Sequence, residues 1–200
     1  MPDSIGHFLL YLRHAIDDPE KPSDSRQTST GQPASFKKGT TMDIKILQQP
    51  DDVTCGPTSL QAVYNHLGYK ISLKQLISEI EFLEDGGTLG VFLGIDALKR
   101  GFKVTLHSYN LTLLDPTWST LSMPELKAKL ELLHKAKHAP KLRKAIEAYI
   151  RFIDLGGKVA FATDIIGDDA KAKIAAMENG TCVLIENVRF DARETKNDPA

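Results

Sequence analysis

The sequence has little of what marks a secreted, membrane-spanning or nucleic-acid-binding protein. Its only two cysteines, Cys55 and Cys182, lie far apart without metal-ligand spacing, so we expect neither a disulfide framework nor a metal site. The formal net charge of −1 gives no reason to expect nucleic acid or an anionic membrane as a partner. The apolar run from Phe8 to Leu12 is too short for a signal sequence, and no stretch approaches the roughly 20 apolar residues of a membrane span. These absences favour a cytoplasmic protein, and no motif indicates a cofactor.

What is present is an ordinary globular composition, with 42% hydrophobic and 26% charged residues. A chain of 200 residues can bury a substantial core without disulfides or metal. The length predicts one domain, or one domain plus a fragment. The oligomeric state is left open by the sequence.

The chain divides into three regions by composition. Residues 1–41 are predicted to be a disordered extension or linker, because residues 16–41 are rich in Pro, Ser, Thr, Gly and charge and carry few large apolar residues. From Met42 the pattern becomes dense. A strand is expected at 44–47, then a helix with Pro57 in its first turn that ends at Leu67. Helices at 72–80 and 89–99, a strand at 102–107, and helices at 122–138 and 140–153 are expected to follow.

After Gly157 the pattern changes. Residues 158–167 predict a buried strand and turn, residues 168–177 a helix, and residues 182–190 a second strand. This is a βαβ-like order, unlike the helical run before it. The third region, residues 158–200, is therefore treated as a short α/β fragment.

Cys55 is the first candidate for chemistry. It precedes an amphipathic helix with Pro57 in the first turn, and a thiolate at a helix N-terminus is stabilised by unpaired N–H groups and the helix dipole. Gly56 would let a substrate carbonyl approach the backbone closely. The Gln49 side chain could donate beside the Cys55 N–H to form an oxyanion hole. The alternative is a buried, unreactive cysteine in a tight turn.

The string QQPDDVTCGPTSLQAVYNHLG resembles the nucleophile segment of the double-glycine leader (bacteriocin-processing) peptidases and their papain-fold relatives. Residues 42–157 carry the resemblance. It implies an α+β fold, the helix-rich N-terminal half of a papain-like cysteine peptidase, followed by the short α/β fragment. It also implies Cys55 as nucleophile, Gln49 as oxyanion donor and a peptide substrate as partner.

The general base of such a peptidase is missing from the expected place. The family carries its histidine after the helices, whereas this sequence has no histidine beyond His138. General-base assistance is worth roughly 10²–10⁴-fold in rate. The expected protein is therefore an incomplete cysteine hydrolase with weak or no activity.

Residues 158–200 resemble part of the N-terminal domain of phosphoglycerate kinase. The resemblance rests on ENVRF followed by ETKNDPA. It implies that Arg189 binds the carboxylate and phosphate of 3-phosphoglycerate, since a guanidinium can bond such anions bidentately. The alternative functions are therefore a fragment of this glycolytic phosphotransferase, or a non-enzymatic chimera. Two resemblances meeting near Gly157 indicate a fusion, a frameshift or an assembly join.

Overall fold

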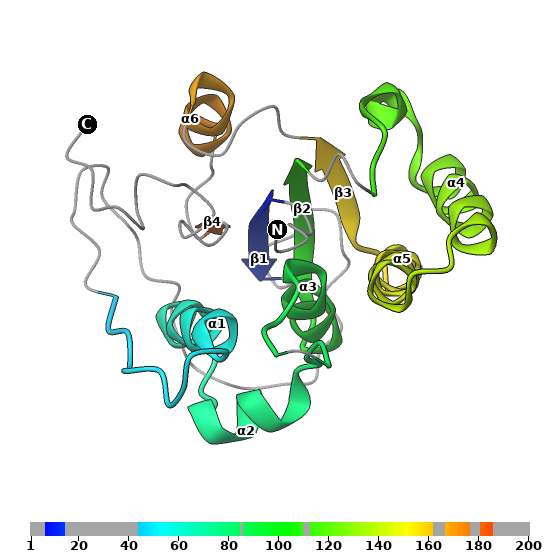
Figure 1. Ribbon diagram of the computed structural model, residues 1–200. Coiled ribbons are helices and arrows are strands. Elements are labelled where there is room, and N and C mark those ends of the chain that lie inside the picture. The colour runs from blue at the N-terminus through cyan, green and yellow to red at the C-terminus, as the bar shows by residue number, and fades with distance from the viewer. Residues whose placement is uncertain are drawn as a thin grey trace, which may run out of the picture.

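A four-stranded sheet forms the centre of the molecule (Figure 1). The structure is a computed structural model that describes residues 7–14, 44–84, 86–109, 113–161, 167–176 and 181–185. The strands lie in the order β3-β2-β1-β4. Their bounds are β1 (His7–His14), β2 (Phe102–Tyr109), β3 (Lys158–Phe161) and β4 (Thr181–Ile185).

The first strand holds the sheet together. β1 pairs antiparallel with both β2 and β4, so that Leu10 lies opposite Leu106 on one side and Leu184 on the other. β3 pairs parallel with β2, with Leu106 opposite Val159. Strands that follow Gly157 therefore share one sheet with strands that precede it.

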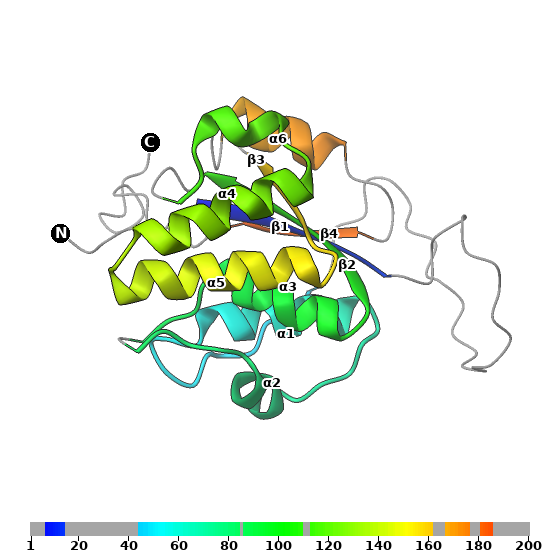
Figure 2. The same ribbon diagram turned by 90° about the vertical axis from the view of Figure 1, so that its right-hand side faces the viewer.

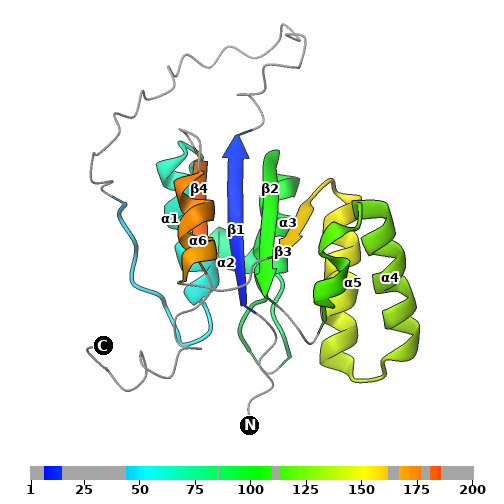
Figure 3. The same ribbon diagram turned by 90° about the horizontal axis from the view of Figure 1, so that it is seen from above.

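Helices cover both faces of this sheet. Figure 1 places α1 and α3 on one face and α6 on the other, and Figure 3 shows α5 and α4 beyond the β3 edge. α4 packs along α5 (Figure 2), and α3 contacts β2 and α5. The helices are α1 (Cys55–His66), α2 (Leu73–Glu79), α3 (Gly90–Lys99), the 3-10 helix η2 (Pro116–Thr120), α4 (Met123–Ala136), α5 (Pro140–Asp154) and α6 (Asp168–Ala175).

The main core lies between β2 and the helices on the α1 and α3 side. Alternate residues of β2 are buried there, namely Phe102, Val104 and Leu106, because successive side chains of a strand point to opposite faces. They pack with residues such as Tyr64 and Phe152 in one apolar cluster.

A polar network is buried beside this core. The Tyr64 hydroxyl donates to Asp96 Oδ2 at 2.7 Å, and Arg100 Nε donates to the same oxygen at 2.8 Å. Burial raises the pKa of Tyr64, and the neighbouring Asp96 carboxylate raises it further. Tyr64 therefore serves as a neutral hydrogen-bond donor, and the network ties α1 to α3.

Several predicted helix ends are confirmed by local contacts. The Ser72 side chain accepts from the Gln75 N–H at the start of α2. The Ser122 N–H and hydroxyl both donate to Glu125 Oε2 at the start of α4, at 2.8 and 2.6 Å. Gly68 has φ +82° just after α1, a conformation that favours glycine.

Two predictions from the sequence are wrong. Residues 7–14, predicted to be part of a disordered extension, form β1; the remainder of residues 1–41 lies outside the described residues. Residues 44–47, predicted to be a strand, form none, and Ile46 and Leu47 are 65% and 50% exposed. Without a neighbouring strand to bond, this short segment cannot form the hydrogen bonds of a sheet.

The predicted α+β class is confirmed by the mixture of helices and a mainly antiparallel sheet. The division of the chain after Gly157 stays a prediction. Among the described residues, no helix has the length and apolar character to cross a membrane.

Candidate functional site

The N-terminus of α1 places Cys55 where the sequence predicts it. Cys55 is the first residue of the helix, half-buried, and carries a thiol rather than a disulfide. Thr54 precedes it as the N-cap without a capping side-chain bond, and its carbonyl accepts from the Thr58 hydroxyl at 2.8 Å. Within the described residues, no group of three or more His, Cys, Asp or Glu could hold a metal ion.

Gly56 has a packing role. A Cβ at this position would lie 2.5 Å from Thr88 Cγ2 and 3.4 Å from Leu93 Cδ1. The space where a Cβ would lie is therefore filled by the segment that leads into α3. The approach of a substrate carbonyl to the Gly56 backbone stays a prediction.

Gln49 lies in a local turn ahead of the helix. Its Nε2 donates to the Asp51 carbonyl at 2.8 Å, while Asp51 Oδ1 accepts from the Val53 N–H at 3.0 Å. One amide proton of Gln49 is thus used inside the turn. Its role as an oxyanion donor stays a prediction.

The described histidine side chains are not arranged as a base for Cys55. His66 lies at the far end of α1, roughly 16 Å along the helix axis. His107 alternates with the buried core residues Val104 and Leu106 of β2, so its side chain points to the other face of the sheet. The charges of Lys173 and Asp169 on α6 act on it there. Burial lowers the pKa of His107, the charge of Lys173 lowers it further, and Asp169 opposes this.

His134 has an acidic partner of its own. Its Nε2 lies 2.6 Å from Glu147 Oε1 on α5 and 3.3 Å from Arg143 Nε. His138 follows the end of α4 and lines a cavity beside α5. Both histidines therefore belong to the α4–α5 region.

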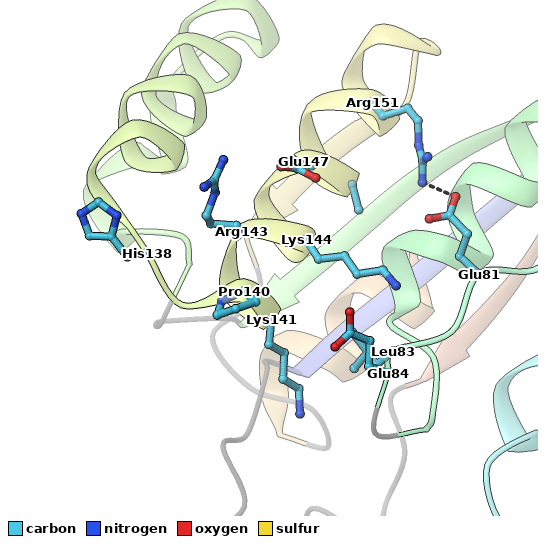
Figure 4. A pocket seen from close by; sticks show the side chains of 11 residues that line it. Glu81, Leu83, Glu84, His138, Pro140, Lys141, Arg143, Lys144, Glu147 and Arg151 are labelled. Atoms are coloured by element: carbon cyan, nitrogen blue, oxygen red, sulfur yellow. Dashed lines mark hydrogen bonds and ion pairs between the residues drawn. The ribbon is translucent and has the colours of Figure 1, made fainter.

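That cavity could take a ligand. It has a volume of about 820 Å³ and lies between α5 and the segment 81–84 (Figure 4). Lys144 Nζ donates to the Phe82 carbonyl at 2.7 Å, and Arg151 pairs with Glu81 at 2.5 Å, joining the two walls. It is lined by Glu81, Leu83, Glu84, His138, Pro140, Lys141, Arg143, Lys144, Glu147, Ala148 and Arg151.

Sequence reasoning missed this cavity. The available signal is the basic character of residues 135–144, which contain five Lys and Arg residues and no Asp or Glu. The opposite wall of the cavity, residues 81–84, lies far from α5 in the sequence. The sequence pattern alone therefore does not show that these two segments meet.

Two positions that the sequence analysis named lie after Gly157. Arg189 lies outside the described residues. Cys182 lies in β4 at the register position opposite Leu12, as expected for a strand residue.

The matches of this chain to known proteins include its second half. The family described as "Phosphoglycerate kinase" matches residues 117–200, which contain α4, α5, β3, α6 and β4. This match covers less than half of the chain. No solved structure matches the chain.

The similar curated proteins are phosphoglycerate kinases. That of Rhodospirillum centenum is 60% identical over 45 residues, covering 22% of this chain and 11% of the relative. That of Pseudarthrobacter chlorophenolicus is 42% identical over 73 residues, covering 34% and 17%. That of Nautilia profundicola is 58% identical over 40 residues, covering 20% and 10%. The chain thus spans between about a tenth and a sixth of the length of these relatives.

These findings confirm the resemblance of the C-terminal region to phosphoglycerate kinase. They overturn the main functional prediction, because the matched family and these relatives are kinases and none is a peptidase. The prediction of a papain-like cysteine peptidase, a hydrolase, is therefore wrong.

Proposed function

We propose that residues 117–200 are a phosphoglycerate kinase-type segment that contributes one anion-binding side chain, Arg189, to a phosphoglycerate site. The family match over residues 117–200 is the observation that carries this proposal. The planar guanidinium of Arg189 suits the carboxylate and phosphate of 3-phosphoglycerate, because it can donate two parallel hydrogen bonds to either group.

The 200 residues by themselves do not transfer a phosphoryl group under this proposal. Phosphoryl transfer depends on holding nucleotide and acceptor in line and on stabilising the charge that develops between them. The chain spans about a tenth to a sixth of the length of the kinases it resembles. Arg189 would therefore lack most of the residues that such a kinase places around its substrates. We propose a segment of a phosphotransferase, with the complete reaction requiring the rest of such an enzyme.

A segment graft tests the proposal. Residues 158–200 would replace the matching stretch of the full-length Rhodospirillum centenum phosphoglycerate kinase, and ATP-dependent turnover of 3-phosphoglycerate would be measured. We expect the graft to retain turnover, because the segment then regains its kinase surroundings. A graft of residues 60–102 at the same place has equal length and lies outside the family match, and should be inactive. A well-folded 158–200 graft without turnover would show that the likeness carries no kinase function.

A further inference from the structure

His107 lies within β2 and has one buried ring nitrogen without a hydrogen-bond partner. This nitrogen is Nδ1, and no group among the described residues donates to it or accepts from it. Across the sheet its neighbours are Leu9 of β1 and Ala160 of β3, two residues without polar side-chain atoms. A neutral imidazole fits this place because Nδ1 can be the nitrogen without a proton, whereas both nitrogens of an imidazolium are donors. A buried donor without an acceptor is unfavourable, so these surroundings favour the neutral ring.

The helix α6 carries a partly buried ion pair. Figure 1 places α6 on the face of the sheet opposite α1 and α3, the face to which the His107 side chain points. Asp169 and Lys173 form an ion pair within α6, and their side chains are 27% and 21% exposed. Asp168 and Lys171 of the same helix are largely exposed. Asp169 and Lys173 therefore lie on the side of α6 that is turned toward the sheet.

The charges on this face oppose protonation of His107. Burial lowers the pKa of His107, Lys173 lowers it further, and Asp169 raises it by less than Lys173 lowers it. Alternate residues of a strand share a face, and strand pairing gives four more charged or titratable positions on the His107 side, none of them acidic. They are His7 and Arg13 of β1, Lys103 of β2 and Lys158 of β3. The fourth strand, β4, contains no charged residue. A proton on His107 would therefore add positive charge to a face of the sheet that is already basic.

We propose that His107 is an acid-sensitive switch for α6, which stays on the sheet while the ring is neutral and is released when the ring takes up a proton. With α6 in place, an imidazolium would leave its Nδ1 proton without an acceptor, and the ammonium group of Lys173 would repel it. Release of the helix gives the ring access to water and moves the ammonium group away, so both costs are removed. The region that matches the phosphoglycerate kinase family includes α6, but the switch does not depend on Arg189 or on phosphoryl transfer.

Amide hydrogen exchange of the full chain at pH 7.5, 6.5 and 5.5, corrected for the intrinsic exchange rate at each pH, tests this switch. An unperturbed histidine has a pKa of about 6.5, so a released state that binds one proton more gains on the closed state below this pH. One extra proton changes this equilibrium by at most about tenfold per pH unit. We expect the protection of the α6 amides to fall by at least about threefold between pH 7.5 and pH 5.5, while α5 stays protected.

Substitutions at His107 and on α6 separate the switch from packing. His107→Leu and His107→Gln cannot take up the proton, so α6 should keep equal protection at pH 7.5 and pH 5.5 in each variant that folds. Lys173→Met removes the ammonium group that repels the ring, so the fall in protection should be smaller than in the parent chain. Lys171→Met, at an exposed position of the same helix, is the matched control and should behave like the parent.

Four results would overturn the proposal. The first is an α6 in the parent chain that has equal protection at the three pH values, or none at pH 7.5. The second is a pH dependence that persists in the folded His107 variants. The third is an equal response of Lys173→Met and Lys171→Met, which decides the matter if neither His107 variant folds. The fourth is an equal loss of protection in α5, because that would be unfolding of the whole chain.

Discussion

At the scale of single residues, the buried carboxylate of Asp96 accepts hydrogen bonds from two different side chains. Its side chain is 8% exposed and accepts from Tyr64 and Arg100. Asp96→Ala would leave a largely buried guanidinium and a buried hydroxyl without this acceptor. We expect a loss of about 3–5 kcal/mol in the free energy of unfolding, measured by urea denaturation.

An exposed ion pair gives the matched control for Asp96. Lys127 and Asp154 lie 2.5 Å apart, but their side chains are 31% and 51% exposed. Asp154→Ala should therefore change the free energy of unfolding by no more than about 1 kcal/mol. Equal effects of the two alanine variants would contradict a stabilising role for the buried network.

Gly56 offers a test of the packing at the start of α1. Gly56→Ala would bring a methyl group to 2.5 Å from Thr88 Cγ2, and overpacking of this kind costs about 1–3 kcal/mol. Thr88→Ser removes that methyl group while keeping the hydroxyl that donates to the Glu81 carbonyl. We expect the double variant to recover most of the stability lost by Gly56→Ala in thermal melts. If it recovers none, the contact with Thr88 is not the reason for glycine at this position.

At the scale of elements, the start of α4 should make stability depend on pH. Hydrogen bonds from the Ser122 side chain and N–H lower the pKa of Glu125 below its ordinary value. A carboxyl group whose pKa is lower in the folded than in the unfolded state contributes its full stabilisation of the fold at a pH above the unfolded-state pKa. This contribution is lost as the pH falls through the folded-state pKa.

The measurement compares the parent chain with Glu125→Ala in urea titrations between pH 7 and pH 3. The parent should be more stable at pH 7, and the difference should shrink below about pH 4.3, the ordinary value for glutamate. A difference that is constant over this range would mean that the Glu125 contact does not contribute through its charge.

The helices could be predicted from the sequence because their ends carry local signals. Ser122 with Glu125, Ser72 with Gln75, and Gly68 each mark a boundary through contacts within a few residues. Such contacts need no knowledge of the fold. The predicted helices in residues 55–154 are confirmed for this reason, to within a few residues.

The strand β1 and the cavity could not be predicted in the same way. β1 comes from a short apolar run, and its partners β2 and β4 lie far along the chain. A short apolar run cannot be assigned by periodicity alone. The cavity likewise needs α5 and residues 81–84 to meet, which only the tertiary fold provides.

At the scale of the whole molecule, β1 should control the stability of the entire sheet. Leu10→Pro removes a backbone N–H and restrains φ in a strand that has partners on both sides, which costs about 3 kcal/mol or more. We expect faster amide exchange throughout β2 and β4. Ile46→Pro, in an exposed segment outside the sheet, is the control and should leave both strands protected. Unchanged exchange in Leu10→Pro would contradict the central position of β1.

The phosphoglycerate kinase-type character of the C-terminal region is the central claim, and kinetics of the 158–200 graft test it most directly. Within the graft, Arg189→Ala should raise the KM for 3-phosphoglycerate or lower kcat/KM by at least about tenfold, because a charged hydrogen-bond donor to the substrate is lost. Arg193→Ala removes an arginine four positions further along and should have little effect. A graft in which Arg189→Ala and Arg193→Ala behave alike would contradict the claim.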